Sequence, residues 1–323
     1  MHTDIKVGLS CNNACVHCIM APAQQRMEAE GQQLDDSREE VERKIKNARK
    51  NGYTKIVLTG GEVTLRPDFV DLVEFAISQG LNVTIQTNAR KLSEPALLDL
   101  LSNFSREKID FVVAYHSDIP TVHDSITRRE GSHAQTVEAI RSLRALRFEV
   151  NGKIVLSLAN YSGLTAILTS LNTLGVRDVI VAFPHAEEFS ADRFSEVVPR
   201  YALVTNPLHE AIEESRTKGM QILCETIPFC VMHDMDWPSN LDLHHIINEL
   251  DPLITVISMP GQPELIDWRQ SRKEIKSKAP QCASCLLDKL CEGPWMEYAT
   301  HFGFSEFVPV DDFPLVERFV TRL

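Results

Sequence analysis

The stretch Cys11-Asn12-Asn13-Ala14-Cys15-Val16-His17-Cys18 places three cysteines at the spacing C-x3-C-x2-C, directly after the short apolar run 5–10. Each iron of a four-iron cluster needs one terminal sulfur ligand, so three thiolates on one tight loop can hold three of the four irons. The fourth iron then stays open to a small molecule. A zinc knuckle or a chance grouping is the alternative interpretation, although zinc sites favour two C-x2-C arms and four ligands.

Short apolar strands alternate with helical patterns from this loop outward, up to residue 183. The first helix is expected from Ser37, whose hydroxyl forms a capping-box pattern with Glu40, to a stop at Gly52. Six strands separated by helices imply a parallel sheet, and closing that sheet far enough gives an α/β fold, a partial (β/α)6 TIM-like barrel. Functional residues should then lie at the carboxyl ends of the strands. The expected strands are 5–10, 55–59, 83–86, 111–115, 154–158 and 179–183.

Gly60-Gly61-Glu62 follows the second expected strand. Two glycines let the backbone come close to a ligand, and a carboxylate can bind an ammonium group. A Gly-Gly turn with a solvated glutamate is the simpler alternative, but the position behind the cysteine loop favours a binding role. Each of the other polar residues near strand ends also fits a turn, capping or surface role. These residues are Thr87, Asn88, Ser117, Arg128, Arg129 and Asn160.

In this combination the loop and the strand ends resemble the radical SAM family. The resemblance implies that Cys11, Cys15 and Cys18 hold a [4Fe-4S] cluster whose open iron binds the amino and carboxylate groups of S-adenosylmethionine (SAM). It implies that the Gly-Gly-Glu element holds the methionyl amino group, and that the polar residues near the strand ends also contact SAM. His17 stands where the family usually has an aromatic ring, which would lie against the adenine.

A second set of cysteines lies near the carboxyl end of the chain. Cys282, Cys285 and Cys291 are spaced C-x2-C-x5-C, and Cys224 and Cys230 are spaced C-x5-C. Both pieces resemble the SPASM/twitch extension, which holds auxiliary iron-sulfur clusters in a large branch of the radical SAM family. The match is partial, because a full SPASM core has a further cysteine that this chain lacks. Five thiols cannot fully ligate two clusters, so we expect one auxiliary [4Fe-4S] cluster with Cys224 or Cys230 as its fourth ligand; a zinc site is the alternative.

The composition limits the class of protein and the cellular compartment that the sequence fits. Of the 323 residues, 43% are hydrophobic, which suits a globular protein, and no run approaches the ~18 apolar residues of a membrane span. The formal net charge of -12 argues against a nucleic-acid groove. Eight cysteines fit metal ligation in a reducing compartment better than disulfides, and no signal-peptide pattern opens the chain, so we expect a cytoplasmic protein. The alternation fades past Pro184, which divides the chain into a barrel at 1–195 and an auxiliary-cluster region at 196–323.

The family resemblance implies reductive cleavage of SAM to methionine and a 5'-deoxyadenosyl radical, which takes a hydrogen atom from the substrate. A ribosomal peptide is the expected substrate, with a crosslink or an oxidation as the outcome. The expected partners are a reductase such as flavodoxin or ferredoxin and a separate leader-peptide-binding protein, because the barrel begins almost at Met1. The alternatives are radical oxidation or rearrangement of a small molecule, a sugar or nucleoside, and a non-catalytic iron-sulfur or zinc redox protein. The Gly60-Gly61-Glu62 element argues against the last of these, which has no need for a SAM pocket.

Overall fold

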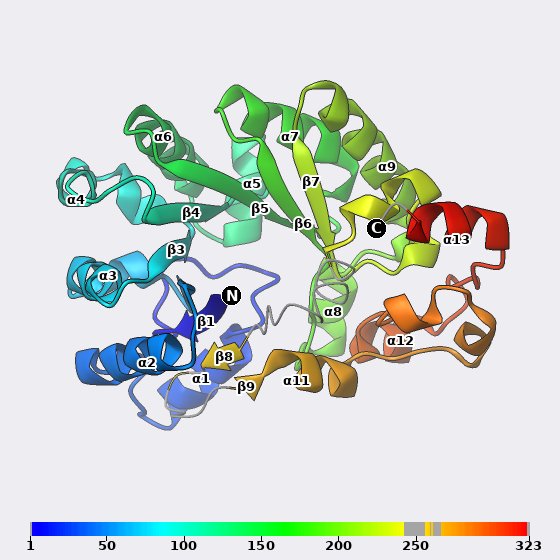
Figure 1. Cartoon of the computed structure of the whole chain (residues 1–323), viewed down its shortest axis with the longest axis horizontal. Helices are drawn as coiled ribbons and strands as arrows, with labels where there is room; N and C mark the ends of the chain where they lie inside the picture. The colour runs from blue at the N-terminus through cyan, green and yellow to red at the C-terminus, as the bar shows by residue number, and fades with distance from the viewer. Residues whose placement is uncertain (1, 242–255, 259, 261–265, 322–323) are drawn as a thin grey trace.

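The computed structural model describes residues 2–241, 256–258, 260 and 266–321. Its centre is a single sheet with the strand order β7-β6-β5-β4-β3-β2-β1-β8-β9. Strands β1 to β8 pair in parallel, whereas β9 runs antiparallel to β8. The sheet curls into an open half-barrel with helices on its outer side (Figure 1). The strands are β1 His2–Lys6, β2 Lys55–Thr59, β3 Asn82–Thr87, β4 Ile109–Ala114, β5 Glu149–Val155, β6 Asp178–Ala182, β7 Gln221–Glu225, β8 Val256–Ser258 and β9 Ile266–Asp267.

This architecture confirms the predicted α/β half-barrel and extends it. Strand β1 ends at Lys6 rather than at residue 10, because the chain beyond it leaves the sheet to form the cysteine loop. A seventh strand, β7, was not predicted. It follows helix α9, Tyr201–Thr217, and pairs with β6. The division of the chain at residue 195 stays a prediction. Strand β7 lies beyond that residue and still belongs to the sheet.

The helices follow the predicted alternation. Ser37 accepts a hydrogen bond from Glu40 N at 3.2 Å and caps α2 as predicted, and Val41, Ile45 and Ala48 of this helix are buried. The helices that cover the barrel are α1 Ala21–Ala29, α2 Arg38–Lys50, α3 Phe69–Ser78, α4 Pro95–Leu101, α5 Pro120–Thr127, α6 Ser132–Ala145, α7 Leu164–Thr173, α8 Ala191–Val197 and α9. Helices α11 Trp268–Ile275, α12 Met296–Phe302 and α13 Phe313–Val320 belong to the extension.

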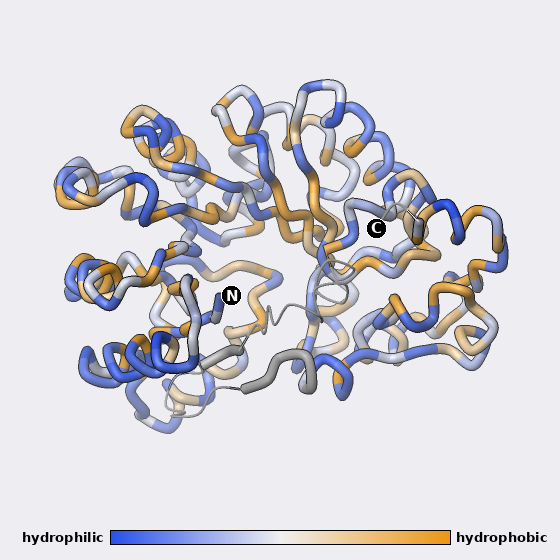
Figure 2. The backbone as a smooth tube through the Cα atoms, in the orientation of Figure 1, coloured by the Kyte–Doolittle hydropathy of each residue, from blue (hydrophilic) through white to orange (hydrophobic). Residues whose placement is uncertain are grey.

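The two faces of the sheet differ in character. Side chains such as Ile5 are fully buried in the hydrophobic layer between strands and helices, and Figure 2 shows hydrophobic residues along the strands. The other face carries partly exposed charges: Asp4 and Lys6 on β1, Lys153 on β5 and Glu225 on β7. Lys153 Nζ and Glu225 Oε2 lie 3.0 Å apart. Burial is the main cause that raises the pKa of Asp4 and lowers that of Lys6. The open face of the half-barrel is therefore polar.

The extension packs against the end of β6 through aromatic rings. The ring centroids of Phe183 and Tyr201 are 4.0 Å apart, and those of Phe183 and Tyr298 are 5.6 Å apart. Tyr201 N donates a hydrogen bond to Tyr298 Oη at 2.9 Å. Among the described residues, no helix combines the length and the apolar character needed to span a membrane.

Candidate active site

The first cysteine loop lies against Gly60 and Gly61, at the carboxyl end of β2. Gly61 N donates to Gly8 O at 2.8 Å, and Glu62 N donates to Ser10 O at 2.7 Å. A Cβ on Gly60 would lie 2.3 Å from Gly8 O, and one on Gly61 would lie 2.2 Å from Ser10 O, so both positions require glycine. The two motifs that the sequence singled out are thus joined by direct backbone contact.

The carboxylate of Glu62 is buried, and its hydrogen bonds are made within the protein. Oε1 accepts from Thr64 N at 3.1 Å, from Thr64 Oγ1 at 2.5 Å and from Thr87 Oγ1 at 2.6 Å, while Oε2 accepts from Asn88 N at 2.6 Å. Burial raises the pKa of Glu62, and these donors oppose that shift. The sequence suggested that this carboxylate binds an ammonium group. In the structure it ties the end of β2 to the end of β3, and the binding of an ammonium group by this carboxylate stays a prediction.

Residues after β3 hold the middle of the loop. Asn88 Nδ2 donates to Asn12 Oδ1 at 2.7 Å and lies 3.9 Å from Cys11 Sγ. Arg90 Nη1 donates to Asn12 O at 2.5 Å and to Asn13 Oδ1 at 2.9 Å. The middle of the cysteine loop is therefore held by side chains of the segment that follows β3.

Helix α8 holds the far end of the loop. Arg193 donates from Nε to Val16 O and from Nη2 to Cys18 O, both at 3.0 Å. The next residue, Phe194, packs on α12, with 4.1 Å between its ring centroid and that of His301. One short helix thus contacts the cysteine loop and the extension with consecutive residues.

The thiols of the loop are near enough to affect one another. Burial raises the pKa of Cys11 to about 11 and that of Cys15 to about 12, and the neighbouring thiol of Cys18 adds to both shifts. Thiolates crowded together in this way need a cationic partner, which a metal centre supplies. The donor set of the loop therefore fits an iron-sulfur cluster held by three cysteines.

His17 packs between the loop and the end of β4. Its ring centroid lies 4.5 Å from that of His116, and its Nδ1 has no hydrogen-bond partner in the part of the chain that the structure describes. Burial lowers the pKa of His17 to about 4, so the imidazole is neutral at pH 7. A neutral ring with an uncommitted nitrogen can contact a ligand at this position.

Ser117 and Asn160 are buried at the ends of β4 and β5, with local partners. Ser117 Oγ accepts from Ile119 N at 3.1 Å. Asn160 Nδ2 donates to His116 O and to Val155 O, both at 3.0 Å. These side chains shape the strand ends that face the loop.

The two candidate arginines are both exposed, just beyond α5. The pKa of Arg193 is lowered by burial and also by the charge of Arg128, which places Arg128 near the cysteine loop. Arg129 N donates to Asp124 O at 3.1 Å, so its backbone belongs to the turn that ends α5. Arg128 is thus the arginine that the electrostatics link to the site.

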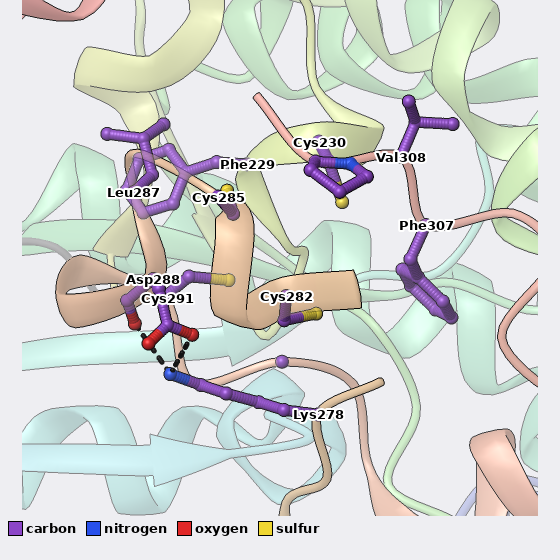
Figure 3. A pocket seen from close by; sticks show the side chains of 12 residues that line it. Phe229, Cys230, Lys278, Cys282, Cys285, Leu287, Asp288, Cys291, Phe307 and Val308 are labelled. Atoms are coloured by element: carbon purple, nitrogen blue, oxygen red, sulfur yellow. Dashed lines mark hydrogen bonds and ion pairs between the residues drawn. The ribbon is translucent and has the colours of Figure 1, made fainter. Parts of the chain in front are cut away.

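Four cysteines of the second set, Cys230, Cys282, Cys285 and Cys291, line one hollow in the extension (Figure 3). Burial raises the pKa of Cys230 to about 12, and the other three thiols add to that shift. Cys285 Sγ accepts a hydrogen bond from Val310 N at 3.3 Å. The remaining lining is largely apolar and includes Phe229, Leu287, Phe307, Val308 and Pro309.

Cys224 lies apart from this hollow. It is fully buried in β7, where it pairs with Val181 of β6. The sequence left Cys224 and Cys230 as alternatives for the fourth ligand, and Cys230 is the one that lies among the other three.

The spacing of the sulfurs bears on the zinc alternative. Tetrahedral zinc, with bonds of about 2.3 Å, holds its sulfurs roughly 3.8 Å apart. Among the described residues, which include all eight cysteines, no three cysteine sulfurs converge within 4.8 Å of one another. The groups that do converge are Cys15 with His17 and His116, and His209 with Glu213 and Asp236. A four-iron cluster separates its cysteines more widely than a single ion does, so the positions of the described sulfurs do not exclude one.

Several residues at the site were missed by sequence reasoning. Arg90 and Arg193 carry no local signal, because their partners lie on a distant loop. Asp4 and Lys6 had a signal, since charges on both sides of the buried Ile5 indicate a strand with one polar face.

Comparisons with known proteins were made for the whole chain. The sequence profile described as Radical SAM superfamily matches residues 5–164. The mycofactocin maturase MftC of Mycobacterium ulcerans (strain Agy99) is 30% identical over 140 residues, which are 43% of this chain and 35% of that protein. A probable GTP 3',8-cyclase of Thermoplasma volcanium is 28% identical over 232 residues, which are 68% of this chain and 63% of that protein. The chain thus spans about a third of the first relative and less than two thirds of the second.

Among solved structures, Streptococcus suis SuiB bound to its precursor peptide SuiA superposes with a TM-score of 0.63. The two chains are 14% identical, and the match covers 96% of this chain and 75% of SuiB. At this level of identity the match shows a shared fold.

Proposed function

We propose that this chain is a member of the radical SAM superfamily, whose profile matches residues 5–164, and that its first cysteine loop holds the [4Fe-4S] cluster at which SAM is reductively cleaved. When bound, the cluster and SAM together supply a 5'-deoxyadenosyl radical that removes a hydrogen atom from the substrate. The observation that carries the proposal is the backbone contact of Gly61 with Gly8, which sets the glycine pair beside the cysteines.

The residues of the loop and strand ends divide the binding of the cofactor among them. Cys11, Cys15 and Cys18 ligate three irons and leave the fourth for SAM. The backbone at Gly60 and Gly61 meets the methionyl amino group. The polar residues around them complete the SAM site: His17 lies against the adenine and Arg128 neutralises the carboxylate, while Glu62, Thr87, Asn88, Ser117 and Asn160 fix the strand ends.

The second cysteine set holds one auxiliary [4Fe-4S] cluster in this proposal, with Cys230 as the fourth ligand. Four thiols around one hollow support full ligation, so this cluster has no iron open to substrate. Its role is then to pass an electron, and the apolar lining of the hollow keeps it from solvent.

The proposed substrate is a ribosomal peptide. Two comparisons support a peptide: one relative is named a maturase, and SuiB was solved with a precursor peptide bound. The polar open face of the half-barrel offers charges of both signs to such a chain. A flavodoxin- or ferredoxin-type reductase would deliver the electron, and a separate protein would present the leader.

A small-molecule substrate is the second candidate, because one relative is named as a probable GTP cyclase. A nucleotide needs cationic groups for its phosphates. Incubating the reduced protein with GTP and SAM tests this candidate, and consumption of GTP would replace the peptide proposal.

The experiment that tests the proposed function is anaerobic loading with iron and sulfide, followed by dithionite and SAM. We expect 5'-deoxyadenosine and methionine, measured by chromatography. An iron-loaded, reduced sample that releases no 5'-deoxyadenosine would contradict the proposal and favour a non-catalytic redox protein.

A further inference from the structure

Helix α9 and the short 3-10 helix η5, Asp234–Ser239, bring together three side chains of the kinds that ligate metals. His209 and Glu213 are four residues apart on α9, so they project from the same side of the helix. This spacing lets one helix offer two ligands to a single ion. A ring nitrogen of His209, a carboxylate oxygen of Glu213 and one of Asp236 all lie within 4.8 Å of one another. Ligands from two separate elements thus converge on one point.

The third of these side chains, Asp236, is held in place by the turn that carries it. Its backbone N–H donates to His233 O at 2.9 Å. The next residue, Trp237, is buried, and its Nε1 donates to Phe229 O at 3.1 Å. The side chain of Asp236 is only 2% exposed. Its carboxylate is therefore fixed below the surface, facing α9.

The hydrogen bonding of the Asp236 carboxylate is incomplete. Oδ2 lies 2.8 Å from His209 Nδ1, within hydrogen-bonding distance. Oδ1 is buried and has no hydrogen-bond partner among the described residues, although Arg216 Nη1 lies 3.2 Å away as an ion pair. Burial is the main cause that raises the pKa of Asp236. A buried carboxylate oxygen of this kind gains free energy from a ligand that binds it directly.

Arg216 is the cation that a metal ion would have to replace. Its Nη1 forms ion pairs with Glu213 and Asp236, while its Nη2 donates to Met235 O at 3.0 Å. The side chain of Arg216 is 36% exposed, and ion pairs of exposed side chains contribute little stability. A divalent ion bound directly to both carboxylates therefore competes well with the guanidinium, which is free to turn toward solvent.

The donor set selects among the divalent ions. Magnesium and calcium prefer sites made of oxygen alone, whereas zinc accepts imidazole together with carboxylates. Zinc needs bonds of about 2.0–2.2 Å to such ligands, so the three side chains close in slightly when they bind it. The side chains of His209 and Glu213 are 29% and 41% exposed, which gives the ion a path from solvent.

We infer that His209, Glu213 and Asp236 form a zinc site that ties α9 to η5. The site contains no cysteine, so it is independent of both cysteine sets and of the proposed function. Asp236 follows Cys230 closely in the chain, and the ion would stiffen the segment that leads away from that cysteine.

The test titrates zinc into the iron-loaded protein under anaerobic conditions, with a coloured zinc chelator as competitor and with iron measured in the same samples. We expect one zinc ion to bind per chain without loss of iron. His209→Ala and Glu213→Gln should each weaken zinc binding at least about tenfold, since even residues behind a ligand contribute that much. Glu210→Gln, an exposed neighbour on the same helix, is the matched control and should leave the affinity unchanged.

Arg216→Met separates a metal site from a plain network of ion pairs. Removing the competing charge should tighten zinc binding about fivefold, the strength of an exposed ion pair. An unchanged or weaker affinity in this variant would contradict the displacement of the arginine. No zinc uptake, uptake matched by loss of iron, or full affinity in both His209→Ala and Glu213→Gln would overturn the site. Tighter binding of magnesium or calcium than of zinc would overturn the choice of metal.

Discussion

The two cysteine sets are built in opposite ways. The loop from Cys11 to Cys18 is held by backbone hydrogen bonds to Ile126 and Thr127 at the end of α5 and by side chains from the segment after β3 and from α8, and it offers three thiols. The hollow in the extension has largely apolar walls and offers four. In the proposed function, a polar, three-thiol loop leaves room for a ligand at the metal, whereas an apolar, four-thiol hollow closes around it. On that proposal, the number of thiols and the polarity of their surroundings together separate a reactive centre from an electron carrier.

The largest effect is expected from Cys15→Ala. Removing one of only three ligands should abolish SAM cleavage, since the cluster cannot be retained in a form that binds SAM. The measurement is 5'-deoxyadenosine from the iron-loaded, reduced variant. Cys224→Ala is the matched control, because Cys224 is a buried cysteine outside both the first loop and the hollow of the extension, and this variant should keep its activity. Residual cleavage at the normal rate in Cys15→Ala would remove the distinction between the two sets.

Cys285→Ala should affect the auxiliary centre and spare the first cysteine loop. We expect the bound iron to fall by about one cluster per chain while uncoupled cleavage of SAM continues and the peptide product is lost. Iron analysis and electron paramagnetic resonance of the reduced protein measure the first effect. Cys230→Ala should behave in the same way, and Cys224→Ala should retain the full iron content. Equal loss of SAM cleavage in Cys15→Ala and Cys285→Ala would contradict the proposed division of labour.

Gly61→Ala tests how tightly the loop is fitted. The new methyl group would lie 2.2 Å from Ser10 O, so the loop must shift, and the affinity for SAM should fall roughly tenfold or more. Equilibrium binding of SAM to the iron-loaded protein measures the change. Gly163→Ala is the control, because a Cβ there meets nothing within 4 Å. An unchanged SAM affinity in Gly61→Ala would show that the glycine contact does not shape the site.

Thr87→Val should give the smallest effect. It removes one donor to the buried Glu62 carboxylate and should lower the free energy of unfolding by about 1–2 kcal/mol. Denaturant titration measures this value. Thr173→Val, on the exposed face of α7, is the control and should change stability by less than about 0.5 kcal/mol. Equal stability of the two variants would mean that the Glu62 network contributes little to holding the strand ends together.

Much of this molecule could be predicted from local patterns. The alternation of strands and helices and the spacing of the first cysteines were enough for the fold class and for the position of the site. The hydrogen bonds of Glu62 within the protein could not be predicted, because their donors Thr87 and Asn88 lie at the end of another strand. The choice between Cys224 and Cys230 was within reach, since Ile222 and Cys224 share one face of an alternating strand and a ligand would have to leave it.

Helix α8 has a consequence for how chains of this design can diverge. It is only seven residues long, and its consecutive residues Arg193 and Phe194 contact the cysteine loop and α12. Successive side chains on a helix point about 100° apart. Inserting or deleting a single residue ahead of this pair would turn both side chains away from their partners at once. Among the surface helices, α8 is therefore poorly placed to tolerate a change of length, although it carries no residue of either cysteine set.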